Sequence, residues 1–330
     1  MRIKVLRPGL LTTVQDKGRY GFQQQGVIVS GAMDTFALRI ANLLVGNAEG
    51  EAALEITLLG PKLMFEEEAL IAVCGADMSP EVDGHPVPPW RPVYVRKGSV
   101  LTFGRCVFGC RAYLAVAGGY AVDQVLGSRS TYLRAEFGGY HGRALREGDV
   151  LEAGMPSAWG RRQMKALSER GETVSIPGWS IGADVMPPYA ENPTVRVLRG
   201  AQFTLFTEES RHALFAEAFQ VTPQSDRMGY RFAGPALTLS EPAEMISESV
   251  VSGTVQVPPG GQPIALLADR QTAGGYPKIA QIISADLPVV AQMKPGDRIR
   301  FTEVTLEEAE KLYVAHEMQI QQVKQGIGLR

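Results

Sequence analysis

Residues 3–14 read IKVLRPGLLTTV, and residues 195–206 read VRVLRGAQFTLF, so the second half of the chain repeats the opening of the first in altered form. A second pair of similar strings follows, with GPKLMF at 60–65 and GPALTL at 234–239. Similar strings in the same order but at unequal spacing indicate a diverged internal duplication. The sequence therefore predicts two related β domains rather than one large sheet.

Short β-branched or alternating runs separated by turn residues recur along the chain. Three runs follow the same kind of turn, Lys97-Gly98-Ser99, Glu147-Gly148-Asp149 and Pro295-Gly296-Asp297, in which Gly supplies a positive φ. We expect hairpin or barrel corners there. The predicted strands include Ile3–Leu6, Ala69–Cys74, Val93–Arg96, Val100–Phe103, Arg111–Val116, Val195–Leu198, Pro263–Ala268 and Arg298–Phe301.

Helical periodicity appears in only a few places. The clearest is Met33–Val45, where apolar residues share one face and Asp34 can cap the start. Two further helices are predicted at Glu208–Phe219 and Leu306–Val323, and a capping box at Thr305–Glu308 precedes the second of them. We therefore expect a mostly β fold with a few short helices.

The length of 330 residues exceeds the usual size of a single core and predicts two domains. We predict a first β domain at residues 1–155 and a second β domain, ending in a helix, at residues 194–330. Residues 156–193 lack a clear period and end in the turn-rich string MPPYAENP, so they are interpreted as the connecting segment.

The 33 basic and 35 acidic residues give a formal net charge of −2, which provides no broad basic field for nucleic acid. No apolar stretch reaches signal-peptide or membrane-spanning length. The three cysteines, Cys74, Cys106 and Cys110, fit neither a redox pair nor a zinc site. We expect a cytoplasmic protein with no nucleic-acid or membrane partner and no metal.

The commonest enzyme motifs, including the phosphate loop, the dinucleotide fingerprint and the nucleophile elbow, are absent. The strongest candidate site is PIALLADRQTAGGY at 263–276, where a strand-like apolar run precedes polar and glycine residues that can contact a small polar ligand. An Asp–Arg ion pair that only stiffens a barrel corner is an equally good interpretation. The residues in question are Asp269, Arg270, Gln271, Thr272, Gly274, Gly275 and Tyr276.

Other polar loops have a similar composition, and each has a simple alternative as a turn or a cap. Residues 30–34 lie at the start of the first predicted helix, where free N–H groups favour an anion. The carboxylate of Glu55 interrupts an apolar run, and it either faces solvent or has a functional role. The loop residues are Gln15, Asp16, Arg19, Ser30, Asp34, Ser128, Arg129, Ser130, Ser225, Asp226 and Arg227.

These segments together resemble the family that holds the C subunit of the bacterial ATP-dependent 5-oxoprolinase, the KipI antagonist and allophanate-hydrolase subunit two. The similarity extends through both halves of the chain. Lys17 departs from the apolar residue that family members usually carry. The matching strings are PGLLTTVQDKGRYGFQQQGVIVSGAMD (8–34), ALRIANLLVGN (37–47), AALEITLLGP (52–61), YLAVAGGY (113–120), LGSRSTY (126–132), SDRMGYR (225–231), SGTVQVPPGGQPIALLADRQTAGGYPKIA (252–280) and PGDRIRF (295–301).

The resemblance implies two cyclophilin-like β-barrel domains and a KipI-like partner, the B subunit. It implies that the B and C subunits use ATP, with or without Mg²⁺, to phosphorylate 5-oxo-L-proline, and that the A subunit opens the activated ring to give glutamate. On this basis we predict Asp269, Arg270 and Gln271 as catalytic. Thr272, Gly274, Gly275, Tyr276, Ser225, Asp226 and Arg227 are predicted to bind substrate, and Gln15, Asp16, Arg19, Ser30, Asp34, Ser128, Arg129 and Ser130 to form a second site or partner surface.

Two alternatives remain open. The chain can be the carboxyltransferase half of a biotin-dependent urea or amide carboxylase, with the biotin carried by another protein. It can also be a non-catalytic antagonist that binds a KipI-like kinase inhibitor.

Overall fold

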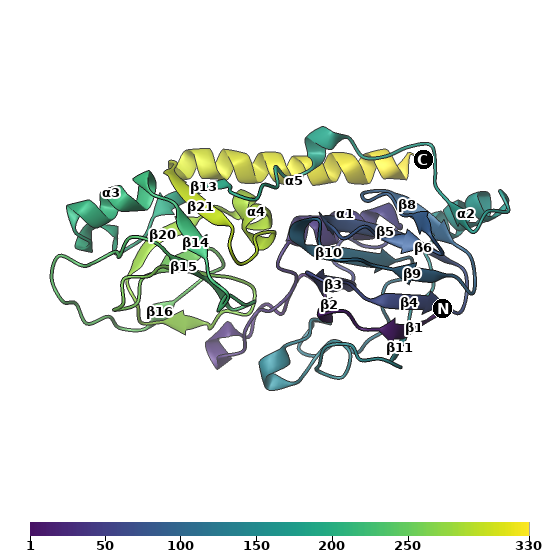
Figure 1. Ribbon diagram of the computed structural model, residues 1–330, viewed down its shortest axis with the longest axis horizontal. Helices are drawn as coiled ribbons and strands as arrows, with labels where there is room; N and C mark the ends of the chain where they lie inside the picture. Colours follow the sequence, from purple (N-terminus) through teal and green to yellow (C-terminus); the bar gives the residue numbers. More distant parts are fainter. Residues whose placement is uncertain (330) are drawn as a thin grey trace. The chain divides into compact units, whose positions relative to one another are not determined.

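The computed structural model describes residues 1–329. The chain forms two compact units that are discontinuous in sequence (Figure 1). The first unit contains Met1–Arg19, Asp34–Pro187 and the chain from Met318 onward, and the second contains Tyr20–Met33 and Pro188–Glu317. Each unit therefore takes a segment from the other half of the sequence, whereas the predicted domain boundaries at 155 and 194 assume contiguous domains and stay a prediction.

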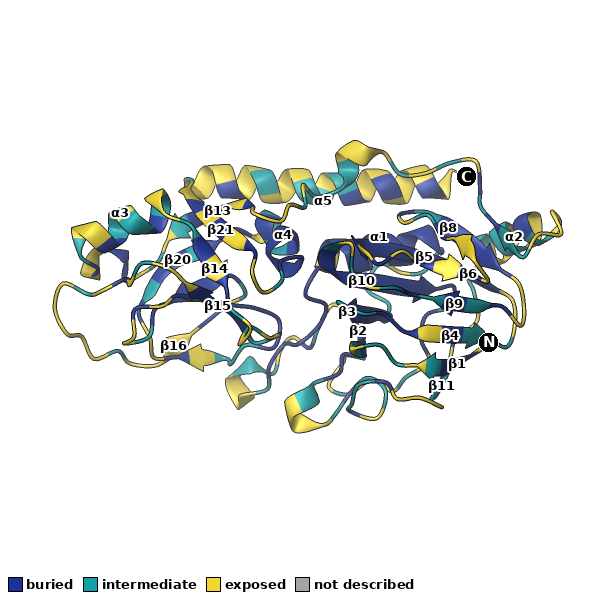
Figure 2. Cartoon of the chain, viewed as in Figure 1, coloured by how far each residue is buried: buried dark blue, intermediate teal, exposed yellow. Residues whose placement is uncertain are grey.

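The first unit consists of two six-stranded antiparallel sheets, with strand orders β11-β1-β4-β9-β6-β7 and β12-β8-β5-β10-β3-β2. The long central strands of the second sheet are buried along most of their length (Figure 2). The strands are β1 (Arg2–Arg7), β2 (Leu11–Gln15), β3 (Ala53–Thr57), β4 (Lys62–Phe65), β5 (Ala69–Asp77), β6 (Glu81–Val82), β7 (His85–Pro86), β8 (Pro92–Val95), β9 (Val100–Thr102), β10 (Phe108–Val116), β11 (Val150–Glu152) and β12 (Val174–Ser175).

The second unit is a closed barrel with strand order β13-β20-β17-β18-β15-β14-β21, in which β13 runs parallel to β21. A separate two-stranded ribbon joins β16 to β19. The prediction of a mostly β fold with few helices is confirmed, and this unit is a barrel as predicted, whereas the first unit consists of two six-stranded sheets. The strands are β13 (Thr194–Arg199), β14 (Phe219–Val221), β15 (Gly229–Ala233), β16 (Glu248–Ser249), β17 (Thr254–Gln256), β18 (Ile264–Leu266), β19 (Ala273–Gly274), β20 (Lys278–Ile282) and β21 (Arg298–Glu303).

The duplicated strings begin alike and then diverge. In the first copy β1 is followed by a second strand, β2, whereas in the second copy β13 is followed by a short 3-10 helix at Phe203–Leu205. Gly9 has a φ of +78° in the turn that leads from β1 in one sheet to β2 in the other, whereas Ala201, at the equivalent position of the second string, lies outside the positive-φ region. A difference in one turn therefore gives the two strings different structures.

All three predicted helices are present. The Asp34 carboxylate accepts a hydrogen bond from the Ala37 N–H at 2.9 Å and caps α1 (Thr35–Leu44). The capping box at Thr305 and Glu308 also forms, and α5 continues past the predicted end at Val323. The helices are α1, α2 (Ala158–Ser168), α3 (Glu208–Ala216), α4 (Leu287–Ala291) and α5 (Leu306–Gly328).

Each unit has its own hydrophobic core. In the first unit, α1 packs on β5 and β10, and every residue of this helix except Thr35 is buried. In the barrel core, the Phe301 ring packs against Phe219 in a tilted arrangement and against Phe232 edge to face. Within residues 1–329 no helix is long and apolar enough to cross a membrane.

Candidate functional site

The predicted catalytic carboxylate, Asp269, lies in a buried polar cluster of the second unit. Arg227 donates two hydrogen bonds to this carboxylate, from Nε to Oδ2 at 2.9 Å and from Nη2 to Oδ1 at 3.1 Å. The two side chains are only 6% and 8% exposed. The Ser30 hydroxyl donates to Oδ1 of Asp269 at 2.8 Å, and Nη2 of Arg227 also donates to the Gly31 carbonyl at 2.5 Å. Three segments far apart in sequence therefore share one charge-assisted network.

The neighbouring loop supports this cluster through its backbone. The Asp269 N–H donates to the Arg227 carbonyl at 2.9 Å, so the two loops bind each other directly. Asp226 accepts hydrogen bonds from the N–H groups of Met228 and Gly229, and Ser225 accepts one from the Arg231 N–H. Ser225 and Asp226 thus shape the turn that presents Arg227.

Arg270 takes part in a different environment from Asp269, although the two are adjacent in sequence. Its guanidinium donates to the carbonyls of Val250 at 3.4 Å and Leu267 at 3.3 Å, and it lines a cavity of about 800 Å³ in the second unit. Burial lowers the pKa of the Arg270 guanidinium. The predicted ion pair at this corner therefore exists, but Arg227 and not Arg270 is the partner of Asp269.

The rest of the 269–276 loop contains β19, which pairs with β16, and also contacts Gln256 of β17. The Gln271 amide approaches the Gln256 side chain at 3.5 Å, and the Thr272 carbonyl accepts from the Val250 N–H. A Cβ at Gly274 would meet the Gln256 amide nitrogen at 2.3 Å, so a larger residue here would have to displace the end of that side chain. Tyr276 is 45% exposed. Ligand binding by these residues stays a prediction.

The predicted second site centres on Asp16 in the first unit. Its Oδ1 accepts from the hydroxyls of Ser128 at 2.7 Å and Ser130 at 2.6 Å, and from the Gly18 N–H at 2.8 Å. Its Oδ2 accepts from the Arg129 N–H at 2.6 Å. A buried carboxylate is thus solvated by four neutral donors, three of them from one short loop.

Arg19 and Gln15 hold the same loop from the other side. Arg19 is fully buried, donates from Nη2 to the Ser130 carbonyl at 2.9 Å, and stacks on the Phe137 ring at 4.6 Å from its centroid. The Gln15 amide donates to the Thr131 carbonyl at 3.2 Å. Arg129 instead points its guanidinium to Glu51. The structure thus brings together most of the predicted group.

Two members of that predicted group lie elsewhere. Ser30 belongs to the second unit and contacts Asp269, because Tyr20–Met33 leaves the first unit before α1 begins. Asp34 caps α1 and is completely buried. The sequence grouped Ser30 with Asp16 because both stand in polar, glycine-containing loops, and composition carries no information about which unit a loop joins.

Sequence reasoning missed a buried network that begins at Asp34. The Tyr113 hydroxyl accepts from the Asp34 N–H at 2.8 Å and donates to Glu55 at 2.7 Å. Arg111 lies 3.8 Å from the same carboxylate. Burial, and then the nearby charges of Glu55 and Asp34, raise the pKa of Tyr113 well above its usual range. The carboxylate within an apolar run was the available signal, since Tyr113 and Glu55 are register partners across β10 and β3.

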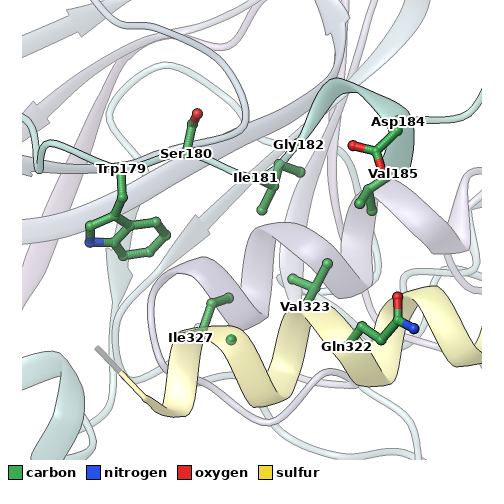
Figure 3. A pocket seen from close by; sticks show the side chains of 10 residues that line it. Trp179, Ser180, Ile181, Gly182, Asp184, Val185, Gln322, Val323 and Ile327 are labelled. Carbon is green, nitrogen blue, oxygen red and sulfur yellow. The ribbon is translucent and has the colours of Figure 1, made fainter.

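The connecting segment and the end of α5 form a separate groove of about 310 Å³ in the first unit (Figure 3). Trp179 and Ile181 extend toward the helix, where Val323 and Ile327 face them. None of the predicted site residues lines this groove. Among the described residues, no group of three His, Cys, Asp or Glu side chains is placed to hold a metal ion.

A family model described as "carboxyltransferase domain, subdomain A and B" matches residues 25–303. The chain belongs to this family. The match contains both the Asp269 cluster and the Ser128–Ser130 loop, whereas Gln15, Asp16 and Arg19 precede it. The resemblance inferred from the sequence strings is confirmed.

Three relatives show how this carboxyltransferase-family chain compares in extent. It is 39% identical over 312 residues to the 5-oxoprolinase C subunit of Haemophilus influenzae, covering 94% of each chain. It is 41% identical over 310 residues to the 5-oxoprolinase C subunit of Escherichia coli, covering 94% of this chain and 93% of that protein. The solved urea carboxylase of Kluyveromyces lactis superimposes with a TM-score of 0.88 at 31% identity, covering 99% of this chain and 29% of that one.

Proposed function

We propose that this chain is the C subunit of an ATP-dependent 5-oxoprolinase, active in a complex with the KipI-like B subunit, and with the A subunit. One observation carries the proposal. The chain matches two 5-oxoprolinase C subunits along more than nine-tenths of both lengths, whereas it corresponds to less than a third of the urea carboxylase. The identities of 39% and 41% to the two C subunits also exceed the 31% identity to urea carboxylase.

The proposed reaction follows from the chemistry of the lactam. An amide carbonyl is a poor electrophile, and transfer of the ATP γ-phosphoryl group to its oxygen, with ADP leaving, makes the ring carbon reactive. Water then adds at that carbon, the ring C–N bond breaks, and phosphate leaves, giving glutamate. The B and C subunits would carry out the first step, and the A subunit the ring opening.

Within this chain, the proposed task is to position and polarise reactants rather than to supply a nucleophile. Asp269 is already committed to Arg227 and Ser30. We therefore assign it a positioning role, in which it fixes the loop that bears Arg270 and Gln271. The cytoplasmic location and the contact between ATP and this chain are both part of the proposal.

The test is reconstitution of the purified chain with the A and B subunits. We expect ATP-dependent release of ADP and glutamate from 5-oxo-L-proline, lost when this chain is omitted. A set that contains the Arg298→Gln variant should form glutamate as the unaltered set does, because the exposed Arg298 side chain makes no hydrogen bond or ion pair within residues 1–329. A complete set of folded subunits that forms no glutamate would contradict the proposal.

The second candidate function is the carboxyltransferase half of a biotin-dependent urea or amide carboxylase. The fold likeness to urea carboxylase and the family description favour it. Its test is transfer of carboxylate from a carboxybiotin carrier to urea by this chain with its partner. Transfer to urea without glutamate formation from 5-oxo-L-proline would establish this alternative over the first.

A further inference from the structure

The second unit contains a cavity of about 800 Å³, and Asp269, Arg227 and Ser30 are not among the residues that line it. All of its lining residues belong to the second unit, so the barrel and the first turns of α5 form it without help from the other unit. Small-molecule sites typically have volumes of about 300–1,000 Å³. The cavity is therefore large enough for a small ligand.

Arg270 contributes the one positive charge to this cavity within the described chain. Its two hydrogen bonds, to carbonyls at 3.4 and 3.3 Å, are long, and no carboxylate of residues 1–329 lies within ion-pair distance of it. Glu310 also lines the cavity but makes no ion pair with Arg270. This half-buried guanidinium faces the cavity with only these two long hydrogen bonds, so an anion bound there would gain a charge-assisted hydrogen bond.

The remaining walls are mainly apolar, with hydroxyl groups and the side chains of Gln23, Gln281 and Glu310. Leu287 and Val314 supply part of the apolar surface, and the hydroxyls of Ser252 and Ser284 make no side-chain hydrogen bond within the part of the chain that the structure describes. Gln281 differs, because its amide already bonds to Thr254, Ser252 and Ile282. One cation, open hydroxyls and apolar walls together suit a small ring that carries a single carboxylate.

We propose that this cavity binds 5-oxo-L-proline, with the carboxylate on the Arg270 guanidinium and the ring methylene groups against Leu287 and Val314. The inference rests on the proposed function, which supplies the identity of the ligand. A planar guanidinium binds a carboxylate through two parallel hydrogen bonds, which gives both affinity and orientation. Arg270 is then the residue that selects a substrate with a carboxylate over the bare lactam.

The binding test uses the full chain, with ¹³C-labelled methyl groups followed by NMR. We expect 5-oxo-L-proline to shift the Leu287 and Val314 methyl signals saturably, and 2-pyrrolidinone, the same ring without the carboxylate, to leave them unchanged at equal concentration. Arg270→Gln should weaken binding roughly ten- to a hundredfold, since a hydrogen bond to a charged group is worth about 1.5–3 kcal/mol. Arg298→Gln should bind as the unaltered chain does.

The activity test separates this inference from the proposed function. In the reconstituted set, Arg270→Gln should raise the KM for 5-oxo-L-proline by a similar factor. If the set forms glutamate while the Arg270→Gln KM is unchanged, or if the methyl signals of the unaltered chain do not move at saturating substrate, the cavity assignment is wrong and the function stands. If the set forms no glutamate, the function fails whatever the methyl signals show. Equal shifts with 2-pyrrolidinone would also overturn the role of Arg270.

Discussion

Asp16 in the first unit and Asp269 in the second are both buried aspartates in polar loops, yet their charges are balanced in different ways. Neutral hydroxyl and N–H donors surround Asp16, most of them from residues 128–130. Asp269 is paired with a guanidinium 42 residues away and with a hydroxyl 239 residues away. The comparison teaches that similar polar loops can solvate a carboxylate locally or can join distant segments through an ion pair.

The largest expected effect is on the ion pair. Arg227→Met leaves Asp269 buried without its charge partner and should destabilise the barrel by about 3–5 kcal/mol. Hydrogen exchange of peptides from β13 and β17 measures this loss in the second unit. Arg298→Met, at an exposed arginine of the same unit, is the control. A loss below about 1 kcal/mol would mean that Asp269 is not held by this pair in solution.

The Asp16 cluster should be less sensitive. Asp16→Ala removes the shared acceptor of four donors, and we expect a loss of about 2–3 kcal/mol, because the freed hydroxyls can rotate to other acceptors. Tryptophan fluorescence in urea measures it, since all three tryptophans lie in the first unit. Asp123→Ala, at an exposed aspartate, should change nothing. If Asp16→Ala lowered the free energy of unfolding as much as Arg227→Met does, neutral donors and an ion pair would stabilise a buried carboxylate equally well in this protein.

A third buried carboxylate, Glu55, extends the comparison because it accepts a hydrogen bond from a phenol, the Tyr113 hydroxyl. Tyr113→Phe removes the hydroxyl between Asp34 and Glu55, and should cost about 1–2 kcal/mol at neutral pH. The pKa of Tyr113 is raised on folding, so its contribution is present below the unfolded value of about 10 and is lost as the pH rises above it.

Urea unfolding between pH 8 and 11 is the corresponding measurement, with the pH range set by the phenol pKa of about 10. The unaltered chain should lose more stability above about pH 10 than Tyr113→Phe does. Parallel pH profiles for the two chains would show that this phenol ionises as freely in the folded protein as in the unfolded one.

The smallest effect is expected for a partly exposed pair, Arg143 and Asp149. The Arg143 hydrogen bonds lower the pKa of Asp149, so the pair stabilises the fold above the unfolded value of about 3.9 and loses its effect as the pH falls through the folded value. Solvent screening limits it to less than about 1 kcal/mol. Asp149→Asn should therefore differ less from the unaltered chain at pH 3 than at pH 5 in the fluorescence assay. An equal difference at both pH values would contradict this.

Local signals predicted much of the secondary structure. The capping residues Asp34 and Thr305 marked the starts of α1 and α5, since a cap depends only on residues three or four apart. The short helix α4 went unrecognised, because a five-residue segment carries too little periodicity. The duplicated strings also misled in part, since Gly9 adopts a positive φ and the equivalent residue of the second string, Ala201, does not.

The candidate residues were recognised more readily than their partners. The loops at 128–130 and 269–276 were identified from composition, and most of the predicted Asp16 group is in contact. The separation of Arg270 from Asp269 was not predictable, because adjacent side chains leave the backbone in different directions and only packing fixes which surface each one meets. The Tyr113–Glu55 pair likewise required the register of β10 with β3.

The predominance of strands, the capped helices, the family resemblance and the polar loops could all be predicted from residue order, because turns, caps and alternation act between near neighbours. Folding in three dimensions was needed to show that residues 20–33 join the barrel unit, that Arg227 is the partner of Asp269, and that Arg270 faces a cavity. The physical reason is that burial forces each charged group to find a partner in space, and chain closure over tens or hundreds of residues leaves no local pattern that specifies which one.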